Sequence, residues 1–163
     1  MNSEIKIDLR PHYPFGYYTE SMEFGSKSLL YYSRKEKALH YKYKAPIIDY
    51  MGDGKKDMDL SVSISEDDAK ALEKVFGLMI NVFNAYKGEP WFVLDGSECV
   101  VICGRRRVRY EGPCFEHPFG EFTHMADSLL NIMENWNQAQ FDEIMKQVPM
   151  IAKSLEEYIA ENR

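Results

Sequence analysis

Residues 89–110, EPWFVLDGSECVVICGRRRVRY, constrain the fold more than any other part of the chain. Asp95-Gly96 stands between two apolar runs, and this dipeptide is a strong hairpin signal because a type I′ turn needs positive φ at both central positions. Gly104 marks a second break, after which a third strand is expected. The continuous apolar run at residues 100–102 is typical of a central strand covered on both faces. The stretch therefore predicts three strands joined by short turns.

Alternating apolar and polar side chains predict further strands elsewhere. Residues 4–10 alternate in this way, which indicates a half-buried strand, and residues 58–64 repeat the pattern. Residues 28–33 and 38–44 predict a hairpin whose arms are joined by the charged residues 34–37. Residues 47–50 are a shorter candidate strand.

Three helical segments are expected. Ser65 and Asp68 resemble a capping box, and apolar residues at three- and four-residue steps continue to Tyr86, before a stop at Gly88. A second helix is expected from about residue 119, and a third apolar stripe runs from residue 141 to residue 159. Pro149 interrupts this stripe, so either one helix kinks there or a new helix begins with Pro149 in its first turn.

Strands joined by short turns and followed by helices define an α+β class. We expect a mostly antiparallel sheet of about six or seven strands with two or three helices packed on one face. The 163 residues suit a single α+β domain that spans residues 1–163.

Composition excludes several classes of protein. The net charge of −6 keeps the chain soluble without implying a partner. Three cysteines are an odd count, which argues against a secreted disulfide framework and favours the cytoplasm. The charged N-terminus predicts no signal peptide, and no apolar run approaches the ~20 residues that span a membrane.

Cysteine and histidine residues in the second half of the chain raise two chemical possibilities. Cys99, Cys103, Cys114 and His117 resemble a zinc set, but on one strand the first two Cα atoms would lie roughly 13 Å apart, too far for two thiolates on one ion. We therefore expect no metal and no cofactor. Cys114 and His117 precede a helix and could form a nucleophilic pair, although no third orienting group is recognisable.

The most unusual feature is a run of arginines. On a regular strand Arg105, Arg107 and Arg109 point the same way, roughly 6.6 Å apart. Lys42 and Lys44, with His40, form a comparable row on another strand. Such cations commonly do no more than cover an exposed sheet face or guard an edge strand. Alternatively, they bind an acidic partner, provided that the two rows share a face, which a one-residue change of register would prevent.

Residues 12–18, HYPFGYY, predict an aromatic loop stiffened by prolines. Tyr13, Phe15 and Tyr17 are candidate partner-binding anchors, since tyrosine is enriched in binding hot spots. The loop could equally be a flap over one end of the core.

Together these features predict a non-catalytic binding or regulatory module, similar in size and composition to inhibitor or immunity proteins. Its expected partner is a protein with an acidic surface, bound through the candidate residues Arg105, Arg107, Arg109, Lys42, Lys44, Tyr13, Phe15 and Tyr17. An alternative is nucleic acid or another polyanion bound by the same basic face, with affinity that falls steeply with salt. A Cys/His-dependent enzyme is a third hypothesis.

Overall fold

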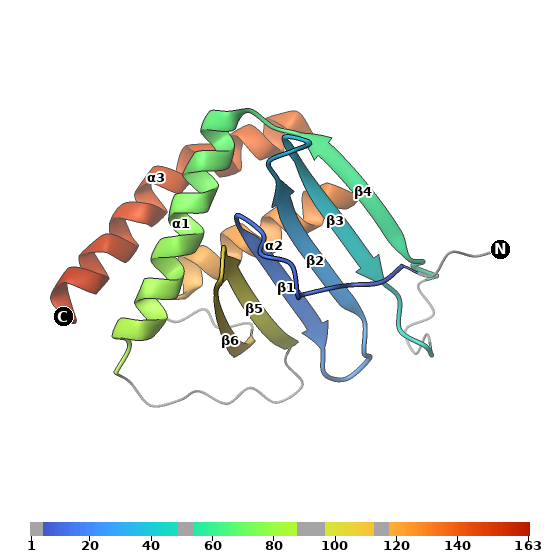
Figure 1. Cartoon of the computed structure of the whole chain (residues 1–163), viewed down its shortest axis with the longest axis horizontal. Coiled ribbons are helices and arrows are strands. Elements are labelled where there is room, and N and C mark those ends of the chain that lie inside the picture. The colour runs from blue at the N-terminus through green and yellow to red at the C-terminus, as the bar shows by residue number, and fades with distance from the viewer. Residues whose placement is uncertain (1–4, 49–53, 88–96, 113–117) are drawn as a thin grey trace.

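The computed structural model describes residues 5–48, 54–87, 97–112 and 118–163 (Figure 1). In chain order the elements are β1 (Gly16–Ser21), β2 (Lys27–Ser33), β3 (Ala38–Lys44), β4 (Met58–Ser63), α1 (Glu66–Ala85), β5 (Ser97–Cys103), β6 (Arg106–Gly112), α2 (Gly120–Glu134) and α3 (Gln138–Glu161). The six described strands form one antiparallel sheet in the order β4-β3-β2-β1-β5-β6. The helices pack on one face of this sheet, which confirms the predicted α+β class.

Several sequence predictions are confirmed in detail. The hairpin of β2 and β3 is joined by residues 34–37, and β4 follows the alternation at residues 58–63. Ser65 caps α1, where its hydroxyl accepts a hydrogen bond from the Asp68 N–H at 3.1 Å. The break between β5 and β6 falls at Gly104, whose φ of 63° favours glycine. The strand expected at residues 89–94, the Asp95-Gly96 turn and the Gly88 stop lie outside the described residues.

Strand β1 lies inside the sheet, between β2 and β5, where an aromatic loop was expected. The prediction for residues 16–18 was wrong because Gly16 was taken as a turn residue. Gly16 instead lies beside the backbone of β2, and an added Cβ would stand 3.0 Å from the Leu30 carbonyl oxygen. A glycine inside a strand commonly marks such a close approach of neighbouring backbone.

Two other predicted strands are wrong within the described residues. Residues 5–10 are extended but do not join the sheet; the chain crosses in front of β3 and β2 (Figure 1). The alternation of apolar and polar side chains in this segment does reflect burial, since Ile7 and Leu9 pack against the sheet surface. The backbone, however, runs across the strands and not along them. Residues 47 and 48 form a bend, and the rest of that candidate strand lies outside the described residues.

The main core lies between the sheet and the helices. Aromatic rings fill its centre: Phe76 of α1 lies 5.0 Å from both Phe15 and Phe122, measured between ring centroids. Helix α3 runs without a break through Pro149, which decides between the two alternatives left by the sequence. Among the described helices, none has a stretch both long and apolar enough to cross a bilayer.

Candidate binding face

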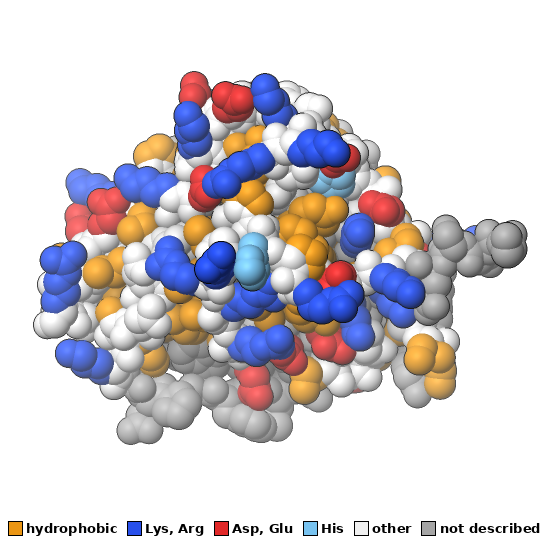
Figure 2. All heavy atoms as spheres, viewed as in Figure 1, with side chains coloured by type: hydrophobic (Ala, Val, Ile, Leu, Met, Phe, Trp, Pro, Cys, Tyr) orange, Lys and Arg blue, Asp and Glu red, His pale blue; other side chains and the backbone are white. Residues whose placement is uncertain are grey.

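The sheet face turned away from the helices, called here the outer face, carries the predicted basic residues. Alternation along β3 places His40, Lys42 and Lys44 on this face, and along β6 it places Arg107 and Arg109 there. We call these two groups the β3 row and the β6 row. Figure 2 shows Lys and Arg side chains spread across this side of the molecule, with hydrophobic surface between them.

Strand register confirms that the two rows share one face. One line of paired residues runs across five strands, from Lys42 through Leu29, Tyr18 and Val100 to Arg109. Four strand spacings separate the two rows, a distance of roughly 19 Å at about 4.8 Å per spacing. Between the rows lies an apolar strip of buried side chains, made by Tyr18, Leu29, Val100 and Ile102.

Arg105 and Arg106 lie outside the β6 row. Arg105 is exposed in the turn before β6, because the strand begins one residue later than the alternation of arginines suggested. Arg106 points to the helix side of the sheet, where it donates a hydrogen bond to Asn81 Oδ1 of α1 at 2.7 Å. The structure thus places two of the three predicted arginines together on the outer face.

Residues 5–14, called here the N-terminal segment, cover the apolar strip. Ile7, Leu9 and Tyr13 pack against it, and the Tyr13 ring lies 4.4 Å from the ring of Tyr31. Partial burial raises the pKa of Tyr13 to about 12. This segment therefore provides an apolar cover between the basic rows.

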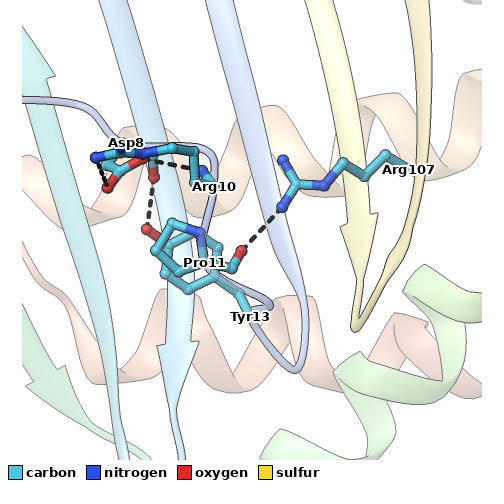
Figure 3. Close-up of polar contacts among 5 residues, drawn as sticks. All are labelled: Asp8, Arg10, Pro11, Tyr13 and Arg107. Carbon is cyan, nitrogen blue, oxygen red and sulfur yellow. Dashed lines mark hydrogen bonds and ion pairs between the residues drawn. The ribbon is translucent and has the colours of Figure 1, made fainter.

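Polar contacts order the N-terminal segment internally and attach it to the β5–β6 hairpin, where the Gly104 N–H donates to the Tyr13 carbonyl oxygen at 2.8 Å; Figure 3 shows several of the others. The Tyr13 hydroxyl donates to the Asp8 carbonyl oxygen at 2.7 Å, and Arg107 donates to the Pro11 carbonyl oxygen at 2.9 Å. Arg10 pairs with Asp8 at 3.0 Å, and this hydrogen-bonded cation lowers the pKa of the exposed Asp8 carboxyl. Arg107 therefore connects the β6 row to the segment that covers the strip.

Acidic residues line one end of the outer face. Glu20, Glu98 and Glu111 pair in register across β1, β5 and β6, two residues from the line that ends at Arg109. Glu98 forms an ion pair with Arg109, and Glu20 lies 3.8 Å from Lys27 Nζ. His40 forms an ion pair with Glu36 when it is protonated. The face is therefore basic along its two rows and acidic at one end.

The sequence analysis missed this acidic row. Glu98 alternates with Val100, so its side was predictable, whereas Glu20 could be placed only after β1 was recognised as a strand.

The expected exposure of the aromatic anchors is wrong for Phe15 and Tyr17, which are 0% and 1% exposed. Both rings lie on the helix side of the sheet, and the Tyr17 hydroxyl donates to Asp127 Oδ1 of α2 at 3.3 Å. A side chain with no accessible surface cannot contact a partner in this conformation. Tyr13 is half-buried on the outer face and remains a candidate contact.

The described cysteines are poorly placed for chemistry. Cys99 is buried and Cys103 is half-buried, and burial raises the pKa of both thiols, to about 11 for Cys99. Such thiols are protonated at neutral pH, whereas the thiolate is the reactive and metal-binding form. Within the described ranges, no cluster of three or more His, Cys, Asp or Glu side chains could hold a metal ion. Cys114 and His117 lie outside those ranges, so the proposed nucleophilic pair stays a prediction.

Comparison with known proteins adds no family: no family model matches the chain, and no curated protein matches it. The function must therefore be argued from the geometry and charge of the outer face.

Proposed function

We propose that this protein is a non-catalytic binding module that docks a protein partner with an acidic surface on its outer face. One observation carries the proposal: the β3 row and the β6 row come from distant parts of the chain and lie on the same helix-free sheet face. Charge complementarity of this kind steers encounter and fixes the orientation of a complex.

The acidic row favours a protein over a long polyanion. A phosphate backbone that ran along the β6 row would pass Glu98 and Glu111, where like charges oppose it. A folded partner can present an acidic patch to the basic rows and a basic or neutral edge to the acidic row.

Nucleic acid is the second candidate, since the same rows could contact phosphates. Nucleic-acid binding would differ from binding of an acidic protein in its salt dependence. Each neutralised phosphate releases counterions, so the affinity for nucleic acid falls steeply as the salt concentration rises. This difference makes the two candidates separable in one assay.

The test is fluorescence anisotropy of the full chain with three labelled probes: a polyglutamate peptide, a single-stranded oligonucleotide and a duplex. A Lys42→Gln/Arg107→Gln variant removes one charge from each row and keeps a polar side chain at both positions. A Lys146→Gln/Lys153→Gln variant removes the same charge from α3, away from the sheet face, and is the matched control. Circular dichroism checks that both variants fold.

We expect the polyglutamate probe to bind at low salt and the row variant to weaken it. Exposed charges contribute about 0.2–1 kcal/mol each, so two losses weaken binding roughly twofold to thirtyfold. The α3 control should retain the affinity of the unmodified chain. Tighter and strongly salt-dependent oligonucleotide binding would replace the proposal by the nucleic-acid alternative. Equal losses in both variants, or no binding of any probe, would refute a specific role for the rows.

A further inference from the structure

Strand β4 is the edge strand at one side of the sheet. The backbone N–H and C=O groups on its outer edge bond to no other described element. The Ile64 N–H donates to the Lys37 carbonyl oxygen at 3.3 Å, in the register that pairs β4 with β3. Paired residues in an antiparallel ladder alternate between bonded and non-bonded pairs, so Val62, Leu60 and Met58 also bond to β3. The backbone groups of Asp59, Ser61 and Ser63 therefore point away from the sheet, and all three residues are exposed.

The two edges of the sheet differ in their protection. At the other edge, β6 carries four charged residues among its seven, and charges on an edge strand discourage pairing with another chain. In β4 only Asp59 is charged among six residues, and the strand contains no proline. Nothing in the described part of the chain covers this edge (Figure 1). An exposed edge strand with few charges and no proline can pair with a strand of another chain.

We propose that β4 pairs antiparallel with β4 of a second copy of this chain, about a two-fold axis at Ser61. The outward-facing residues match each other in this register: Ser61 lies opposite its own copy, and Asp59 lies opposite Ser63. Self-pairing therefore places no like charges opposite each other, although β4 is acidic. The two sheets join into one, and both outer faces lie on the same side of it.

The same register brings apolar side chains together. Leu60 lies opposite Val62 of the second copy in a non-bonded pair, where side chains are closest. Both side chains are on the helix side of the sheet, and Leu60 is 36% exposed in the single chain. Self-pairing extends the core across the junction. A contact between two six-residue strands is small, so the association is weak and depends on concentration.

The proposed register can be tested by placing either a positive or a negative charge at residue 63. Ser63→Lys creates two favourable pairs with Asp59 across the axis, and Ser63→Asp creates two unfavourable pairs. Sedimentation equilibrium of the full chain, from micromolar to millimolar concentration, should give a dimer whose dissociation constant falls in the lysine variant and rises in the aspartate variant. Each change is expected to be roughly twofold to thirtyfold.

Cysteine crosslinking tests the position of the axis. In Ser61→Cys the two new residues face each other with Cα atoms about 5.5 Å apart, within the range of a disulfide. In Ser63→Cys, the matched control, they lie about 14 Å apart along the strands and cannot bridge. Under mild oxidation only the first variant should form more covalent dimer than the unmodified chain, as read from a non-reducing gel.

Either of two results overturns the proposal. One is a monomer at the highest concentration for the unmodified chain and both charge variants, which would leave the edge open only to a different protein. The other is equal crosslinking of Ser61→Cys and Ser63→Cys, which would show that the chains collide without this register. Thermal unfolding of dilute samples separates these outcomes from loss of the fold.

Discussion

Replacement of Pro149 by alanine is expected to stabilise the protein. Pro149 lies in the middle of α3, which extends from Gln138 to Glu161. A proline there removes one backbone hydrogen bond and crowds the carbonyl group of Met145, four residues earlier. The side chain is exposed, so its removal leaves no cavity in the core.

The magnitude follows from two opposing contributions. Alanine is more favourable than proline inside a helix by about 3 kcal/mol. Loss of proline also makes the unfolded chain more flexible, which offsets about 0.4–1 kcal/mol of the gain. The net increase in the free energy of unfolding is therefore about 2 kcal/mol. For a chain of this size, that corresponds to a rise in Tm of roughly 4–8 °C.

Urea denaturation followed by circular dichroism measures the effect, with Met150→Ala as the control. Met150 is exposed on the same helix turn, and its replacement should change the free energy of unfolding by less than about 0.5 kcal/mol. A Pro149→Ala variant as neutral as this control would refute the reasoning. That result is the one expected if Pro149 began a separate helix, since proline is well tolerated in a first turn.

Two further predictions concern the core. Phe122→Ala should lower the free energy of unfolding by about 3–5 kcal/mol, because the ring is fully buried against Phe76 and Tyr17; a loss below about 1 kcal/mol in urea denaturation would contradict this packing. Burial raises the pKa of Asp127 above its ordinary 3.8, so the folded chain holds this proton more tightly than the unfolded chain, and stability falls as the pH rises from 3.8 through the folded pKa. Asp127→Asn keeps an oxygen that can accept from the Tyr17 hydroxyl, so its stability relative to the unmodified chain should grow over that range and then level off. A variant that is less stable than the unmodified chain at neutral pH would contradict the sign.

Local patterns account for the elements that were predicted well. The β2–β3 hairpin, β4 and α1 each combine a clear period with a recognisable boundary, such as the Ser65 cap. Strand β1 was missed because Gly16 and the nearby prolines are ordinary turn signals. The glycine is explained only by the closeness of the Leu30 carbonyl oxygen, which belongs to another strand.

The N-terminal segment shows the same limit of local reasoning. Its alternation correctly indicated that one side is apolar, and Ile7 and Leu9 are indeed packed. Alternation describes where side chains point and not where backbone hydrogen bonds go. A segment that crosses a sheet therefore has the same signature as a strand within it.

The sequence by itself determined which side of the strand the residues of the β3 row and the β6 row take, because side chains alternate along any strand, although it wrongly included Arg105 in the strand. It did not determine that the β3 row and the β6 row share a face, because that depends on the order and register of the strands between them. Those strands include β1, which pairs on one side with β2, the next strand in the chain, and on the other with β5, which follows only after β4 and α1. Non-local pairing therefore decided the candidate site, and it also decided which edge of the sheet is left unguarded.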